Sequence, residues 1–100
     1  SEAGGLFRAA QIFSMCEAAG VPNAIGSMPE TGVGTAAEVH LGLAMANLTV
    51  AADCCGSSYY DEDFLRTPLE VRDGSAHPPQ KPGLGVELDE EVFTRWCEAG

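Results

Sequence analysis

The apolar positions in the first half of the chain follow two different spacings. Over residues 6–19 they recur at helical spacing, which predicts a helix, and Gly20 follows at the position where helices commonly end. A short apolar run over residues 21–28 predicts a buried strand. Helical spacing returns up to about Asn47, and the run over residues 48–53 predicts a second strand. This order of helix, strand, helix and strand is typical of a parallel α/β protein.

The second helix has two candidate N-caps. Thr35 and Glu38 have the spacing of a capping box, while Thr31 could cap the helix from an earlier position. The helix is rich in glycine and alanine, and these small residues allow close packing against a sheet.

The second half of the chain has a different character. Residues 59–65 predict at most a short helical turn, and residues 69–77 predict a hairpin around the turn Asp73-Gly74. Residues 78–83 are rich in proline and predict an ordered loop or linker. Asp89 is predicted to cap a final helix. The apolar side of that helix is predicted to hold Val92, Phe93, Trp96 and Cys97.

Composition narrows the classes of partner. The formal net charge is −10, from 15 acidic against 5 basic residues, which argues against nucleic acid because phosphates would be repelled. No apolar run approaches the roughly 20 residues of a membrane span, so we expect no membrane partner. The four cysteines form no C-x-x-C pair beside histidines, which argues against a zinc site or a disulfide scaffold. We expect buried thiols and a cytoplasmic location.

The predicted elements are too few to close a core. A domain of 100 residues is small, and such domains are marginal even with a closed core. Two parallel strands without neighbours leave sheet edges and apolar faces exposed. We therefore expect this chain to be part of something larger.

Three motifs occur in a distinctive order. A-G-G covers residues 3–5, G-S-M-P-E-T-G-V-G-T-A-A covers residues 26–37 with His40 following, and P-G-L-G-V-E-L-D covers residues 82–89. With these motifs at these separations, the chain resembles the last third of the mandelate racemase/muconate lactonizing enzyme family, in the enolase superfamily.

The resemblance implies the C-terminal portion of a modified TIM barrel, (β/α)₇β, whose tail returns to an α+β cap domain. Residues 1–56 would supply the last β/α units, namely the sixth helix, the seventh strand, the seventh helix and the eighth strand. Residues 57–100 would form a C-terminal segment whose hairpin, Pro/Gly loop and final helix pack on the barrel and the cap.

The resemblance also implies a chemistry. Family members abstract a proton next to a substrate carboxylate and pass through an enediolate, with Mg²⁺ held by carboxylates on the third to fifth strands. Those strands and the catalytic lysines would precede Ser1, so the resemblance implies Mg²⁺ bound by residues outside this segment, which alone is expected to be inactive. The whole protein would be an isomerase, racemase, epimerase or dehydratase that takes a small carboxylate substrate, and it would form a homo-oligomer.

Five residues are candidate site residues on this mapping. Asp53 lies where the family has an acid, usually Glu, at the end of the eighth strand, and it would hydrogen-bond the substrate as charge develops. Glu30, in the M-P-E-T motif at the end of the seventh strand, is the second catalytic candidate, in direct chemistry or in support of the loop. Ser27, Met28 and Cys54 would line the rim as substrate contacts. None of the five is predicted to bind a metal.

His40 falls inside the second helix, so it is interpreted as a packing residue. The absence of a histidine at the end of the seventh strand favours the lysine-dependent, muconate-cycloisomerase-like branch.

Instead of a segment of an enzyme, the chain could be an independent, non-catalytic α/β interaction module. That alternative requires residues 21–25 and 48–50 to find strand partners within the chain.

Overall fold

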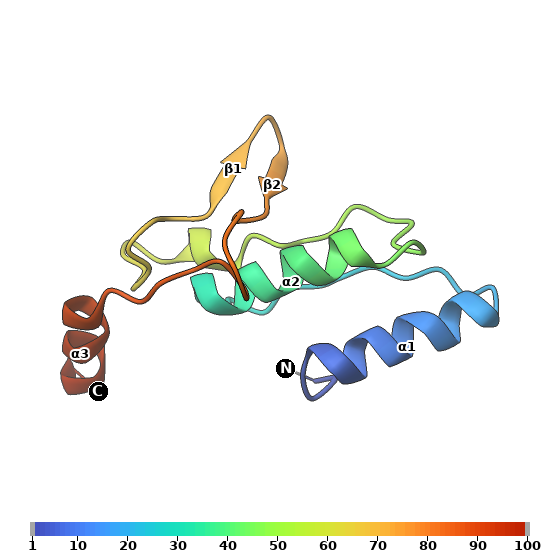
Figure 1. The fold of residues 1–100 in the computed structure, drawn as a ribbon, viewed down its shortest axis with the longest axis horizontal. Coiled ribbons are helices and arrows are strands. Elements are labelled where there is room, and N and C mark those ends of the chain that lie inside the picture. Colours follow the sequence, from blue (N-terminus) through green and yellow to red (C-terminus); the bar gives the residue numbers. More distant parts are fainter. Residues whose placement is uncertain (1, 100) are drawn as a thin grey trace.

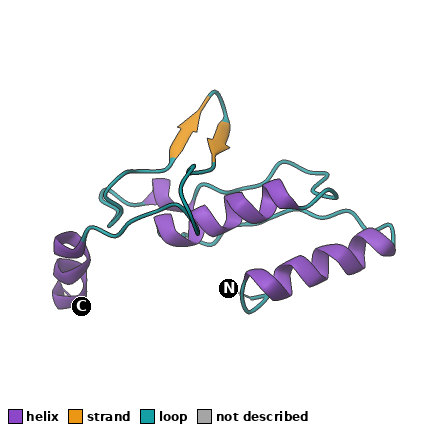
Figure 2. Ribbon diagram, viewed as in Figure 1, coloured by secondary structure: helices purple, strands orange, loops and turns teal. Residues whose placement is uncertain are grey.

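The computed structural model describes residues 2–99 of the chain. The elements are α1 (Leu6–Ala18), α2 (Gly32–Ala44), the 3₁₀ helix η1 (Gly56–Tyr59), β1 (Glu70–Arg72), β2 (Ser75–His77) and α3 (Glu90–Ala99). In Figure 1, α1 lies beside α2, the hairpin β1–β2 projects away from them, and α3 lies at the far end of the molecule from α1. Long loops join most of these elements, while a tight turn connects β1 and β2 (Figure 2). The molecule measures 46 × 29 × 25 Å, and its radius of gyration of 14.5 Å exceeds the roughly 13 Å of a compact chain of this length.

Helix α1 confirms the predicted first helix to within one residue. It ends at Ala18, and Gly20 follows with a positive φ of 68°. The amide of Val21 donates to the carbonyl of Cys16 over 2.8 Å, which closes the last turn. A glycine suits this position because it adopts the left-handed conformation without a Cβ penalty.

Helix α2 differs from its predicted bounds at both ends. Thr31 is the N-cap residue, without a side-chain cap bond, so the Thr35–Glu38 capping box is wrong. The helix ends at Ala44 instead of continuing to Asn47. Met45 is already extended, and Asn47 Nδ2 donates to the carbonyl of Phe13 over 3.2 Å. Asn47 therefore connects the end of α2 to α1 instead of extending the helix.

The two predicted strands are wrong as regular strands but right in their direction. The first extended segment (residues 21–28) and the second extended segment (residues 48–53) run parallel, joined by one bridge between Asn23 and Leu48. The amide of Thr49 donates to Asn23 O over 3.2 Å, and that of Asp53 donates to Ile25 O over 2.9 Å.

The irregularity of this pairing has a physical reason. Between its two hydrogen bonds the first segment advances by two residues, 23 to 25, and the second by four, 49 to 53, so the register is interrupted. Within residues 2–99 neither segment has a strand on its other side. A lone parallel pair lacks the neighbours that normally regularise a parallel sheet.

The hairpin is confirmed. Strands β1 and β2 pair antiparallel, with Glu70 opposite His77 and Arg72 opposite Ser75. Asp73 and Gly74 both have positive φ, 51° and 72°, as a two-residue hairpin turn requires.

The helical turn predicted within residues 59–65 lies earlier than expected. Helix η1 ends at Tyr59, and Leu65 instead forms an antiparallel bridge with Leu88. Leu65 is buried at 7% exposure, so this bridge belongs to the small core and not to a surface turn.

Helix α3 is held by an aromatic cluster. The ring of Phe64 lies 5.4 Å from that of Phe93 and 5.3 Å from that of Trp96, and Tyr60 lies 5.5 Å from Trp96. These contacts confirm Phe93 and Trp96 on the predicted apolar side, whereas Cys97 is exposed. The predicted cap is also confirmed.

The cap of α3 gives a first testable prediction. Asp89 Oδ1 accepts hydrogen bonds from the amides of Glu91 at 3.1 Å and Val92 at 3.2 Å. We expect Asp89→Ala to lower the free energy of unfolding by about 1 kcal/mol, the usual value of such a cap. Urea unfolding measures this, with Asp61→Ala, a change at an exposed aspartate, as the control. Equal effects of the two substitutions would contradict the capping role.

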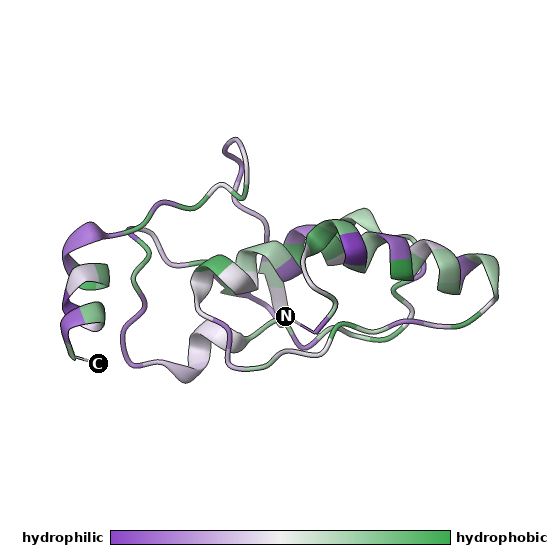
Figure 3. Cartoon of the chain, turned by 90° about the horizontal axis from the view of Figure 1, so that it is seen from below, coloured by the Kyte–Doolittle hydropathy of each residue, from purple (hydrophilic) through white to green (hydrophobic). Residues whose placement is uncertain are grey.

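The core is small for the chain length. Its buried side chains are Phe13, Ile25, Thr35, Ala36, Val39 and Leu65. Apolar residues run along α1 and α2 (Figure 3), and several are exposed, including Phe7 at 77% and Met15 at 72%. In the part of the chain that the structure describes, no helix has both the length and the apolar character needed to cross a membrane. The predicted packing of residues 57–100 on a barrel and a cap stays a prediction.

Candidate active site

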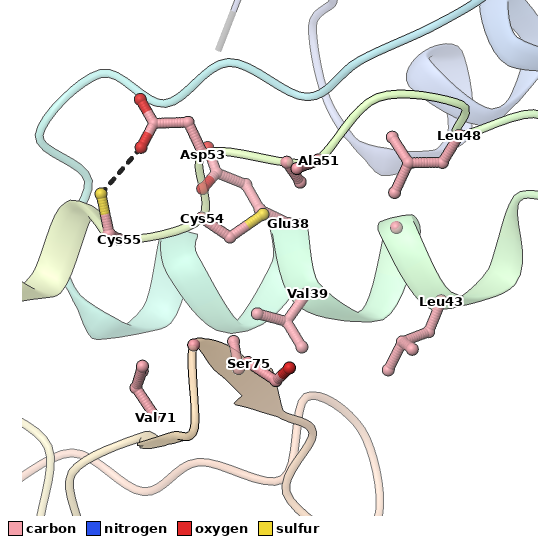
Figure 4. A pocket seen from close by; sticks show the side chains of 14 residues that line it. Glu38, Val39, Leu43, Leu48, Ala51, Asp53, Cys54, Cys55, Val71 and Ser75 are labelled. Atoms are coloured by element: carbon pink, nitrogen blue, oxygen red, sulfur yellow. Dashed lines mark hydrogen bonds between the residues drawn. The ribbon is translucent and has the colours of Figure 1, made fainter.

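The ends of the two extended segments bring four of the predicted site residues together. Ser27 and Met28 end the first segment, Glu30 follows it, and Asp53 ends the second. All four line one hollow of about 520 Å³. Cys54 lies on an adjoining hollow of about 350 Å³, which Asp53 also lines (Figure 4). The parallel direction of the segments explains this result, because their carboxyl ends meet at the same edge.

Helix α2 fixes the two loops that carry these residues. The Thr35 hydroxyl, only 1% exposed, accepts from the amide of Ser57 at 3.1 Å and donates to the carbonyl of Glu30 at 3.4 Å. Gly56 lies so close to the same loop that a Cβ there would be 2.6 Å from Glu30 N and 2.7 Å from Glu30 O. The end of one segment is therefore held against the end of the other.

Sequence reasoning missed Glu38 as a site residue. Its carboxyl group projects from α2 toward the second segment, beside Asp53 and Cys54 (Figure 4), and its Oε2 is buried without a hydrogen-bond partner. Burial raises the pKa of Glu38, and the negative charge of Glu30 raises it further, against a smaller opposing effect of Ser27. A signal was present in the sequence, because Glu38 is the only charged residue of α2.

The adjacent thiols are not nucleophiles in this arrangement. Burial, followed by the charges of Glu38 and Asp53, raises the pKa of Cys54 to about 11. A hydrogen bond from Cys55 Sγ to Asp53 Oδ1, 2.8 Å long, raises the pKa of Cys55. Both side chains are therefore neutral thiols near pH 7, and the thiolate is the reactive form.

The carboxylates do not form a metal site. In the described range 2–99, no group of three or more His, Cys, Asp or Glu side chains converges closely enough to hold an ion. Glu30 folds back over the first turn of α2, where its Oε2 would lie 2.9 Å from a Cβ on Gly34. The arrangement forms a rim of carboxylates, in which burial raises the pKa of one carboxyl group, that of Glu38.

His40 is confirmed as a packing residue. Its Nε2 lies 3.0 Å from the carbonyl of Leu84, in the loop of the P-G-L-G motif. This contact holds the loop against α2, and His40 does not line the hollow that contains Asp53.

The environment of Glu38 predicts a pH-dependent stability. A carboxyl whose pKa is higher in the folded than in the unfolded state stabilises the protein fully only below its unfolded value, and this contribution disappears as pH rises through the folded pKa. We therefore expect Glu38→Gln to stabilise the protein relative to the parent sequence more at pH 7.5 than at pH 4.5. Urea unfolding at the two pH values measures this difference. Glu17→Gln, at an exposed position of α1, is the control. A stability gain from Glu38→Gln that is the same at both pH values would contradict the interpretation.

The helices α1 and α2, with the paired parallel segments and the acids at their carboxyl ends, form an α/β segment. A model of the family described as enolase C-terminal domain-like matches residues 1–92. The chain belongs to this family and has its α/β fold.

The similarity extends to individual proteins. Muconate cycloisomerase 1-1 of Acinetobacter lwoffii is 36% identical over 99 residues, which are 99% of this chain and 26% of that protein. The crystal structure of muconate lactonizing enzyme from Klebsiella pneumoniae has a TM-score of 0.88 at 34% identity, and the match covers 94% of this chain and 26% of that one. An enolase from Gibberella zeae PH-1 complexed with magnesium, formate and sulfate has a TM-score of 0.76 at 30% identity, covering 97% and 24%. The chain thus spans about a quarter of the length of the relatives it matches.

Proposed function

We propose that this chain is the C-terminal part of a magnesium-dependent isomerase of the muconate cycloisomerase kind. One observation carries the proposal. Glu30, two residues past the first extended segment, and Asp53, at the end of the second, line one hollow in a chain 36% identical to a muconate cycloisomerase over nearly its whole length. On this proposal the segments are the seventh and eighth strands of a (β/α)₇β barrel, in which active sites form at the carboxyl ends of the strands.

The proposed reaction is abstraction or delivery of a proton at the carbon next to a carboxylate of a small substrate, through an enediolate. Asp53 hydrogen-bonds the substrate where charge develops, since it is the acid at the open end of the second segment. Glu30 supports the loop above α2 or contacts substrate directly. Ser27, Met28 and Cys54 contribute the substrate surface around them. On this proposal the magnesium ion is bound by residues outside this segment, as the resemblance to the family implies.

The exposed surfaces support a larger assembly. Val21 is 50% exposed and Val50 is 57% exposed, each on an extended segment with one edge unpaired within the described part of the chain. On the proposal, further strands of the barrel cover these edges, and the remaining barrel and cap pack on α1 and α3. We also propose that the whole protein is cytoplasmic and forms a homo-oligomer.

The alternative is an independent interaction module. It requires the two segments to find strand partners within this chain, and among residues 2–99 they pair only with each other. The intact mass of the native polypeptide separates the two proposals. A chain of several hundred residues supports the enzyme, whereas a folded monomer of 10.4 kDa favours the module.

Turnover of muconate by the whole protein tests the proposed function. We expect conversion of muconate to its lactone in the presence of Mg²⁺ and loss of that activity when the metal is removed with EDTA. Residues 1–100 alone, under the same conditions, are expected to give no turnover. A folded whole protein that leaves muconate and related unsaturated or α-substituted carboxylates unchanged would contradict the proposal, as would turnover by residues 1–100 alone.

A further inference from the structure

A side-chain hydrogen bond joins Asp53 to the thiol two residues further along the chain. Cys55 Sγ donates to Asp53 Oδ1 over 2.8 Å, as Figure 4 shows. Asp53 is exposed, and an exposed carboxylate otherwise samples several rotamers. The bond occupies one oxygen of Asp53 and leaves Oδ2 available to a substrate.

Further hydrogen bonds fix the backbone at both residues of this pair, Asp53 and Cys55. The amide of Asp53 donates to Ile25 O over 2.9 Å. The carbonyl of Cys55 accepts from the amide of Ser58 at 2.9 Å and from its hydroxyl at 2.7 Å. The next residue, Gly56, is packed against the backbone of Glu30. The backbone that carries the carboxylate and the thiol is therefore held in place before any substrate binds, which favours a pre-organised site.

The thiol also stays a donor near neutral pH. The hydrogen bond to Asp53 raises the pKa of Cys55, so its proton is retained. The neighbouring Cys54 is a natural comparison. It carries the same functional group, but its side chain lies against Glu38 on the hollow beneath (Figure 4).

We propose that Cys55 is a positioning residue, which holds Asp53 by one carboxylate oxygen so that the other faces the substrate. The inference rests on the proposed function, in which Asp53 contacts substrate. It also accounts for the aspartate at this position, because Asp reaches one methylene less far than Glu and its orientation therefore matters more.

Kinetics of the whole protein with muconate test the positioning role. Cys55→Ala is expected to lower kcat about tenfold with KM within about twofold, since the carboxylate is still present but misplaced. Cys55→Ser is expected to recover most of the loss, because a hydroxyl donates to the same oxygen. Cys97→Ala, at an exposed position of α3 away from the candidate site, is the control, with kcat near that of the parent. Unchanged kcat in Cys55→Ala, no recovery in Cys55→Ser, or an equal loss in Cys97→Ala would overturn the proposal.

A second measurement, the alkylation rate of Cys55, does not depend on turnover of a substrate. Asp53→Ala removes the acceptor, so Cys55 is expected to be alkylated several-fold faster by iodoacetamide at pH 8, because more of it is thiolate. Peptide mass spectrometry measures this rate in the whole protein, with the exposed Cys97 as internal control. An unchanged rate at Cys55 would overturn the proposed contact. If the parent protein has no turnover, the proposed function fails, while the alkylation rate still decides whether Cys55 holds Asp53.

Discussion

Asp53→Asn lowers kcat for muconate by about 10²–10³-fold in the whole protein, with a smaller change in KM. The reason is that Asp53 lies at the open end of the second extended segment, where a group facing the substrate acts mainly on charge that develops in the transition state. The fold is expected to be retained, because the backbone amide of Asp53, and not its side chain, holds the two segments together. Steady-state kinetics with Mg²⁺ present measure the effect.

The matched control for this substitution is Asp73→Asn. Asp73 is also an exposed aspartate, but it lies in the hairpin turn with a φ of 51°, a conformation that asparagine tolerates well. The kcat of Asp73→Asn should equal that of the parent protein. If Asp53→Asn retained full activity, or if both variants lost it equally, the assignment of Asp53 to the reaction would be wrong.

Gly56→Ala lowers the free energy of unfolding by about 3 kcal/mol, the upper end of the usual range for overpacking. A Cβ at this position would meet the nitrogen and oxygen of Glu30 at 2.6 and 2.7 Å. These are backbone atoms, which cannot rotate away as the end of a side chain could. Urea unfolding measures the loss.

Gly26→Ala is the control for Gly56. A Cβ there has no neighbour within 4 Å, and its backbone has no positive φ, so the change is expected to be small. Because Gly56 also sets the distance between the loops of Glu30 and Asp53, its replacement should lower activity as well. A stability of Gly56→Ala equal to that of Gly26→Ala would show that the two loops are not in the described contact.

The elements that could be predicted from sequence are those whose signals are local. Helix α1 with its glycine end, the Asp73-Gly74 hairpin and the cap at Asp89 depend on a few neighbouring residues, and the structure has all three. The proximity of Ser27, Met28, Glu30 and Asp53 also follows, because the parallel order of two segments places their ends together.

What could not be predicted depends on distant parts of the chain. Beyond the early end of α2, Asn47 donates to Phe13, more than 30 residues away, and no local pattern encodes that contact. Regular pairing of the two extended segments requires neighbouring strands on both sides, so apolar runs alone could not establish it. Glu38 was assigned to a cap by its spacing from Thr35. Its place beside Asp53 comes from the packing of α2 on the second segment.

The most direct test of the account is incorporation of solvent deuterium by the whole protein. Muconate is converted in D₂O with Mg²⁺ present, and the product is examined by mass spectrometry and NMR. The account predicts one deuterium at the carbon next to a carboxylate, formed at a rate that falls with Asp53→Asn. A product free of deuterium at that carbon, or equal rates in the two proteins, would contradict it.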